Sequence, residues 1–331
     1  MYTLTRMIVA WITVFAGLLG LAFGSFLNVC ATRWPAEESV VRGRSHCRSC
    51  GRTIAWWENI PLASWLVLGG RCQTCKAPIG WRYPLVELAV GSLWAFAAWR
   101  VLAGAVDLAL PLDVLGYQIS VAAGLMLFLW LLVALAVLDA ENLWLPDRLV
   151  WPGIVLGILS SFLWLAAASE LSGKYFEEIH LSALPMTMSM ESVMKLGYFL
   201  EAVKFPGVGS PIAGFLLLVA GPALAAASIL LVRWVYWIVR RREGIGLGDA
   251  KLVAMLAAWL GLDGALLAFS IGCILGALTA LALLALPASR KHTPDWALRK
   301  LPFGTFLCLG AIISVFWGRL LISAYERWAG F

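Results

Sequence analysis

Long apolar stretches recur through the whole chain and constrain its fold more than any other feature. A helix that crosses a bilayer needs roughly 20 mostly apolar residues. Eight segments are candidates: 7–29, 84–104, 114–138, 149–168, 211–239, 251–262, 264–288 and 303–325. The segment 251–262 is too short to cross alone, so we expect it to start earlier, tilt or lie buried among its neighbours. The sequence therefore predicts an all-α polytopic membrane protein with about eight transmembrane helices.

The composition agrees with a lipid environment. Hydrophobic residues make up 62% of the chain and charged residues 13%, which is too little charge to cover the surface of a water-soluble enzyme of 331 residues. The first apolar segment exceeds the usual length of a signal-peptide core, and no small-residue cleavage site follows it. We therefore expect residues 1–29 to remain as an anchoring transmembrane helix.

Lysine and arginine are distributed unevenly over the connections between these segments. Residues 30–83 alone hold eight of them, and the connections on the same side of an eight-span chain are far more basic than those on the other side. Loops rich in lysine and arginine stay in the cytoplasm, so we expect 30–83 to be cytoplasmic and both termini to be external. This explains the net charge of +6 without a nucleic-acid partner.

Four cysteines in the segment 30–83 form two Cys-x-x-Cys pairs, Cys47 with Cys50 and Cys72 with Cys75, separated by 21 residues. Two such pairs supply the tetrahedral sulfur shell that Zn²⁺ prefers in structural sites. A redox pair is the alternative, but thiols in the reducing cytoplasm are more often bound to metal. The segment is too small to build much apolar core, so we expect a zinc region in which the metal provides folding energy.

Two aspartates stand out at the cytoplasmic ends of predicted helices. Asp139 ends the third apolar stretch, and Asp249 follows the glycine turn Gly246-Leu247-Gly248. Taken singly, Asp249 is as readily a helix cap, and Asp147 is a better candidate for a cap. A phosphate-binding glycine loop is a rival interpretation, but it lacks the lysine at the required spacing. Two carboxyls held close together share one proton and can activate water, which is the chemistry of aspartic proteases.

Motifs along nearly the whole chain add to this pattern in order and spacing. They are Gly24-Ser25-Phe26-Leu27-Asn28-Val29 followed by Arg33 and Pro35; the four cysteines; Asn59-Ile60-Pro61 with Ser64; Gly69-Gly70-Arg71-Cys72; Arg82-Tyr83-Pro84-Leu85-Val86-Glu87; Asp139 with Leu145-Pro146-Asp147; Gly246-Leu247-Gly248-Asp249 with Lys251; and Pro302-Phe303-Gly304. Together they resemble the prepilin peptidase (type IV leader peptidase) family. Members are membrane aspartic proteases that process the leaders of type IV pilins and type II secretion pseudopilins.

The resemblance implies a multi-pass protein of the bacterial inner membrane in which Asp139 and Asp249 are the catalytic pair. Its expected partners are prepilin or pseudopilin substrates and membrane lipid. Two features differ from the usual family pattern: an external insertion at 169–210, and Thr305 at a position where proline is common. We divide the chain into 1–29, the zinc region 30–83, and a membrane peptidase core 84–331.

Many family members also methylate the new N-terminal amine with S-adenosylmethionine, and this activity is associated with the cysteine-bearing region. No dinucleotide-type fingerprint supports it, so the methyl donor is implied by resemblance alone. Candidate cofactor-binding residues are Asn28, Glu87 and Gly70, each with a structural alternative. Asn28 could equally bond a neighbouring helix, an ionisable Glu87 inside a span favours function, and Gly70 suits a turn of the zinc region better than a cofactor.

Three functions compete at this level. The first is a peptidase that also methylates, the second is a peptidase without methyltransferase activity, and the third is a zinc-stabilised membrane scaffold or transporter. A transporter is expected to carry charged or broken helices near the bilayer midplane. Here the aspartates lie at helix ends, which favours the peptidase.

Overall fold

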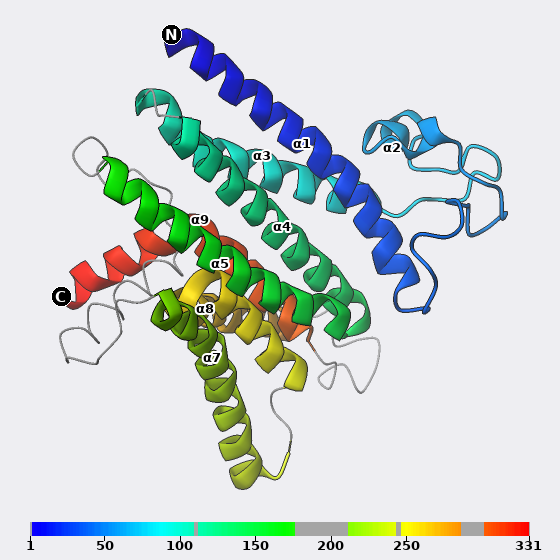
Figure 1. Ribbon diagram of the computed structural model, residues 1–331. Helices are drawn as coiled ribbons and strands as arrows, with labels where there is room; N and C mark the ends of the chain where they lie inside the picture. The colour runs from blue at the N-terminus through cyan, green and yellow to red at the C-terminus, as the bar shows by residue number, and fades with distance from the viewer. Residues whose placement is uncertain (1, 109–111, 176–210, 243–245, 286–300, 331) are drawn as a thin grey trace. The chain divides into compact units, whose positions relative to one another are not determined.

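The computed structural model describes residues 2–108, 112–175, 211–242, 246–285 and 301–330 (Figure 1). In these ranges the chain is helical, with two isolated β-bridges and no longer strand. The long helices are α1 (Tyr2–Arg33), α3 (Arg82–Leu108), α4 (Leu112–Asn142), α5 (Asp147–Tyr175), α7 (Pro211–Arg240), α8 (Leu247–Ala285) and α9 (Phe303–Ala329). Two short elements, η1 (Trp56–Asn59) and α2 (Ala63–Val67), lie between α1 and α3. The prediction of an all-α chain is confirmed.

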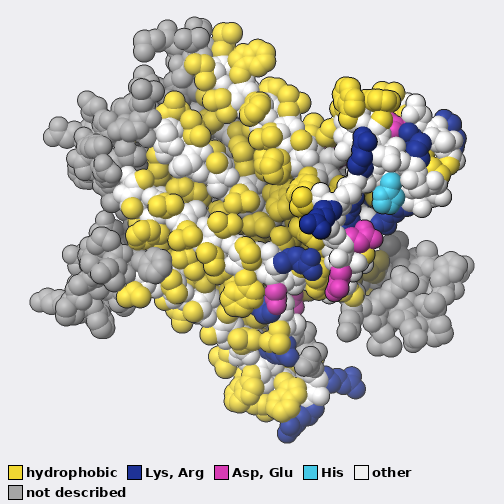
Figure 2. All heavy atoms as spheres, turned by 45° about the vertical axis from the view of Figure 1, so that its right-hand side comes forward, with side chains coloured by type: hydrophobic (Ala, Val, Ile, Leu, Met, Phe, Trp, Pro, Cys, Tyr) yellow, Lys and Arg dark blue, Asp and Glu magenta, His cyan; other side chains and the backbone are white. Residues whose placement is uncertain are grey.

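Among the described residues, seven helices are long and apolar enough to cross a membrane. Their outer faces carry large apolar side chains: on α1, Trp11, Phe15 and Leu18 follow one another at helical spacing and are 70%, 66% and 61% exposed. On the face that Figure 2 shows, hydrophobic side chains cover much of the described surface of the long helices. Such faces would drive aggregation in water and are stable against lipid tails, so the chain is a multi-pass membrane protein.

Helix α8 contains both the sixth and the seventh predicted segments. It is interrupted at Gly261, where φ is 73° and ψ is 175°, a backbone conformation that is essentially restricted to glycine. The arm before the break starts at Leu247, earlier than the predicted residue 251, and is buried almost continuously from Ala250 onward. The short predicted segment 251–262 therefore begins earlier than predicted and lies buried among its neighbours. These are two of the three alternatives that the sequence left open.

The two arms of α8 run in opposite directions. The second arm lies antiparallel to α9, with three successive contacts: Gly264 with Ser314, Ala268 with Gly310, and Gly272 with Leu307. The first arm and α9 begin at the same level, because Gly248 and Gly304 both pack against Leu145. The chain therefore reverses at Gly261, and the seven apolar helices contain the eight apolar segments that the sequence predicts.

The chain divides into two compact units, residues 1–134 and 135–331. In the first unit α1 lies along α3 (Figure 1), and glycines allow the two backbones to approach closely. A Cβ at Gly24 would lie 2.7 Å from the Cα of Glu87, and one at Gly20 would lie 2.9 Å from the Cα of Gly91. Gly20 and Gly24 form a small-x-x-x-small pattern of the kind that joins helices in membranes.

In the second unit α8 packs against α5, α7 and α9. Its first arm is tied to α5 by two side-chain hydrogen bonds: the indole N–H of Trp259 donates to the carbonyl of Gly153 at 2.8 Å, and the hydroxyl of Ser161 donates to the carbonyl of Ala258 at 3.1 Å. Of the predicted external insertion 169–210, residues 169–175 continue α5 and the remainder lies outside the described residues.

Candidate functional site

The zinc region is built from two copies of one backbone unit, 25 residues apart, which the sequence analysis missed. In the first copy Cys47 N–H donates to Arg52 O and Ile54 N–H to Ser45 O, both at 2.8 Å. In the second copy Cys72 N–H donates to Ala77 O at 2.9 Å and Ile79 N–H to Gly70 O at 2.7 Å. The residue that follows each Cys-x-x-Cys pair has a left-handed backbone: φ is 70° at Gly51 and 58° at Lys76. The sequence signal that could have revealed the repeat is the correspondence between residues 45–54 and 70–79. In both segments the Cys-x-x-Cys pair has the same position and an isoleucine is the last residue.

The two units bring the four cysteine sulfurs together. All four Sγ atoms lie within 4.8 Å of one another, and those of Cys47 and Cys75 are 3.8 Å apart. A tetrahedral zinc ion with Zn–S bonds of about 2.3 Å sets its sulfurs about 3.8 Å apart. All seven cysteines of the chain are free of disulfide bonds. The cluster is therefore compatible with a metal site and disfavours the interpretation as a disulfide pair.

Backbone amides around the cluster favour thiolates. The N–H groups of Cys75 and Thr74 donate to the sulfur of Cys72 and lower its pKa to about 6. The amides of Cys50 and Ser49 likewise lower the pKa of Cys47. The thiolate is the form that binds metal, so these amides favour the metal-binding form of Cys72 and Cys47. In contrast, despite the amide of Ala77, burial and hydrogen bonds with the other cysteines raise the pKa of Cys75 to about 11.

Glu58 holds the loop that follows the first copy. Its carboxylate accepts two hydrogen bonds from Arg52, at 2.7 and 2.9 Å, and one from the amide of Ala55 at 2.9 Å. The ion pair with Arg52 and the amide of Ala55 lower the pKa of Glu58. This carboxylate is thus bound within the zinc region.

The three candidate cofactor residues occupy two places in the first unit. Asn28 and Glu87 lie on facing stretches of α1 and α3: Nδ2 of Asn28 donates to Tyr83 O at 3.0 Å, and Glu87 accepts the amide of Leu62 at 2.8 Å. Gly70 belongs to the second cysteine unit, where a Cβ would lie 2.8 Å from the ring of Trp65. Asn28 and Glu87 therefore lie about one turn apart along the interface of α1 and α3, and Gly70 has a packing role.

Asp139 lies three residues before the end of α4, and the start of α9 holds its carboxylate. Oδ2 accepts the backbone N–H of Thr305 at 2.7 Å, and the Thr305 hydroxyl lies 3.2 Å from the same oxygen. A Cβ on Gly304 would lie 3.0 Å from the carboxyl carbon. Asp139 is 6% exposed, so its carboxyl is buried. The residues that contact this carboxyl, Gly304 and Thr305, lie 165 and 166 positions later in the chain.

Asp249 lies in the first turn of α8 and is half-buried. Its Oδ2 accepts the amide of Gly246 at 3.0 Å. A Cβ on Gly246 would lie 3.2 Å from that oxygen, and one on Gly248 would lie 3.3 Å from the side chain of Leu145. These contacts explain the two glycines: each leaves space at a position where a side chain would displace the carboxylate or the helix start.

The two aspartates lie near each other in the second unit. Gly304 packs against Asp139, Gly248 directly precedes Asp249, and both glycines pack against the side chain of Leu145. Asp147 takes a different position, since it is exposed and forms an ion pair with Lys251 at 2.7 Å. The structure therefore brings Asp139 and Asp249 together and leaves Asp147 on the surface.

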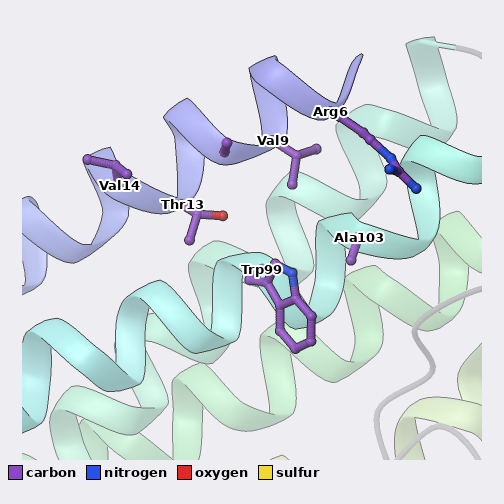
Figure 3. Close-up of a pocket in the computed structure, with 7 residues that line it drawn as sticks. Arg6, Val9, Thr13, Val14, Trp99 and Ala103 are labelled. Carbon is purple, nitrogen blue, oxygen red and sulfur yellow. The ribbon is translucent and has the colours of Figure 1, made fainter. Parts of the chain in front are cut away.

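A groove of about 500 Å³ lies elsewhere, in the first unit (Figure 3). Arg6, Val9 and Thr13 of α1 and Trp99 of α3 contribute to its lining. Its lining residues include no carboxylate. It therefore lacks the groups for hydrolysis, and the paired aspartates are the candidate active site.

Fold and site define a polytopic membrane protein with two carboxyls held together near helix ends in one unit and a cluster of four cysteines in the other unit. Comparison with known proteins agrees with this class. Residues 18–101 match the bacterial peptidase A24 N-terminal domain, and residues 203–281 match the type IV leader peptidase family. No solved structure matches.

Three relatives are each named prepilin leader peptidase/N-methyltransferase. The Pseudomonas aeruginosa protein is 32% identical, with 95% of this chain and 93% of the relative covered. The Pseudomonas putida protein is 30% identical, with 100% and 99% covered. The Myxococcus xanthus protein is 36% identical, with 81% and 63% covered. This chain belongs to the type IV leader peptidase family.

Proposed function

We propose that this protein is a membrane aspartic endopeptidase that cleaves the leaders of type IV prepilins or type II secretion pseudopilins. The observation that carries the proposal is the meeting of Asp139 and Asp249, from α4 and α8, each held by a backbone amide. Two neighbouring carboxyls that share one proton can divide the roles of acid and base. Membership of the leader peptidase family and the names of the relatives support prepilins as substrates.

The positions of the aspartates suggest where the substrate is cut. Asp139 and Asp249 each lie within one turn of a helix end, where backbone polar groups and water are available. A leader peptide outside the lipid could reach this level while the apolar helix that follows it stays among the membrane helices. The peptidase then needs a shallow polar notch between α4, α8 and α9.

We also propose that the protein methylates the new N-terminal amine after cleavage, as the relatives' names indicate. S-adenosylmethionine would supply the methyl group. Asn28 and Glu87 would contribute to holding it: Oδ1 of Asn28 is buried and accepts no hydrogen bond within the described structure, so it can accept one from a ligand. The packing of Gly70 against Trp65 supports a role for this glycine in a turn of the zinc region instead of in cofactor binding.

The zinc region and the active site are proposed to face the cytoplasm, with the protein in the bacterial inner membrane. Support comes from the eight lysines and arginines of residues 30–83 and from thiols that suit a reducing compartment. Zinc is the proposed metal, since four cysteine sulfurs within 4.8 Å of one another suit the tetrahedral thiolate site that it prefers.

Mass spectrometry of a purified prepilin incubated with the protein tests both activities. We expect loss of the leader with or without S-adenosylmethionine, and a further gain of one methyl group only when it is present. Loss of the leader without any methyl gain would leave a peptidase alone. An intact prepilin under all conditions would refute the peptidase and favour a scaffold or transporter.

Gly304→Ala tests the packing around Asp139. The added Cβ would lie 3.0 Å from the carboxyl of Asp139 and 3.1 Å from Leu145, so the carboxyl must move. A misplacement of about 1 Å can cost about 100-fold in rate, so a shift of a few tenths of an ångström should lower cleavage several-fold, measured as kcat/KM on a prepilin. Gly221→Ala on α7 is the matched control, because a Cβ there meets nothing within 4 Å. Equal activity of the two variants would contradict this packing.

A further inference from the structure

Thr305 offers two donors to one oxygen of Asp139. Its backbone N–H lies 2.7 Å from Oδ2, and its hydroxyl lies 3.2 Å from Oδ2 and 3.0 Å from the carbonyl of Ala136. The hydroxyl has one proton, so it donates to either acceptor and turns to Oδ2 when that oxygen carries charge. The N–H has no such choice, and it donates to Oδ2 throughout.

The start of α9 adds to this preference for charge. Thr305 is the third residue of α9, and the amide of Gly304 also donates to the Asp139 carboxyl. Unpaired amides in the first turn of a helix favour an anion. Asp139 thus lies at the N-terminus of a helix other than its own, within reach of two amides and a hydroxyl.

Among the described residues, Asp249 has fewer donors than Asp139. It also lies in the first turn of a helix, but within the described residues its carboxylate is held by a single amide, that of Gly246 in an exposed turn. When two carboxyls share one proton, the one with more donors is better stabilised as the anion. The difference in donors therefore distinguishes two residues that are chemically identical.

We propose that Thr305 is a positioning residue that keeps Asp139 ionised, so that Asp139 is the base of the pair and Asp249 the acid. The inference rests on the proposed peptidase function. Oδ1 of Asp139 takes a proton from water, whose oxygen bonds to the scissile carbonyl carbon, while Asp249 gives its proton to the carbonyl oxygen. The C–N bond then breaks as the proton on Asp139 passes to the leaving amine nitrogen, and one hydroxyl of the intermediate returns its proton to Asp249, which re-forms the carbonyl and restores the pair.

Substitutions at Thr305 separate its two donors. Thr305→Val removes the hydroxyl and keeps the N–H, Thr305→Ser keeps both, and Thr305→Pro removes both. Proline is tolerated in the first turn of a helix and is common at this position in the family that the sequence resembles. Each variant is thus expected to fold, which melting of the full-length protein in detergent would verify.

The measured quantity is kcat/KM for prepilin cleavage as a function of pH. The base must be ionised, so losing a donor moves the acid limb of the profile to higher pH. We expect a shift of about one pH unit for Thr305→Val and a larger one for Thr305→Pro. Thr305→Ser should keep the wild-type profile. Ser323→Ala, which removes a hydroxyl bound to Leu320 O farther along the same helix, should not shift the profile.

Two outcomes would overturn the proposal. In one, the acid limbs of Thr305→Val and Thr305→Pro coincide with that of the wild type. In the other, the rates of both fall equally at every pH, which a purely structural role produces. Failure of the peptidase function itself has a different signature, since the wild-type protein would then leave the prepilin uncut, and both proposals would be rejected.

Discussion

Asp139→Asn or Asp249→Asn alone is expected to abolish prepilin cleavage, by at least about 1,000-fold in kcat. Each asparagine is nearly isosteric but cannot accept or deliver the proton that the pair shares. The variants should still insert into membranes and retain any bound metal, because the cysteine cluster lies in the other compact unit. Cleavage kinetics, membrane fractionation and metal analysis of the same preparations check the three parts of this result.

Asp147→Asn is the matched control for both variants. Asp147 is a nearby aspartate whose carboxylate is 60% exposed and pairs with Lys251. An exposed ion pair contributes at most about 1 kcal/mol, so this variant should cleave at a rate within a few fold of the wild type. Substantial cleavage by Asp139→Asn or Asp249→Asn would remove the pair from the mechanism.

The second large effect concerns the metal. We expect about one zinc ion per chain, and we expect a variant with Cys47, Cys50, Cys72 and Cys75 all replaced by serine to lose it. Without metal the zinc region has little apolar core to hold it, so limited proteolysis should cut residues 34–81 rapidly. Cys273→Ser, which replaces an exposed cysteine of α8 outside the cluster, should retain zinc and resist cleavage. A quadruple variant that binds as much zinc as the wild type would show that the cluster has another purpose.

The same measurement has a defined pH dependence and tests orientation. The pKa of Cys72 is about 6 and that of Cys75 about 11, so protons compete with metal over the whole range below about pH 11, and zinc affinity declines steadily as the pH falls. A chelator that cannot cross membranes should remove zinc from sealed inside-out vesicles and leave right-side-out vesicles loaded. The opposite pattern would place the zinc region outside the cytoplasm.

Much of the candidate site follows from features that are local in sequence. The apolar segments are recognisable because a bilayer requires about 20 apolar residues for each crossing. The cysteine pairs are recognisable because two residues between ligands suit one metal. Asp139 and Asp249 are conspicuous as carboxyls at the ends of apolar helices, where ionisable groups are rare.

Other features depend on contacts between distant residues. The break at Gly261 becomes a chain reversal only through the antiparallel packing of α8 on α9. The glycines at 246, 248 and 304 are explained only by the folded structure, in which Asp249, Leu145 and Asp139 occupy the space that a Cβ would need. A short polar or glycine motif carries no information about which distant group will pack against it.

Thr305 shows the limit most clearly. In the sequence, Thr305 is notable only because proline is common at this position in the family that the sequence resembles. In the structure it supplies two donors to Asp139, 166 positions earlier in the chain. The sequence by itself determined which residues can perform the chemistry, because that depends on functional groups and local spacing. Only the tertiary structure decided which of them meet and which carboxyl receives more donors, because helix packing sets those distances.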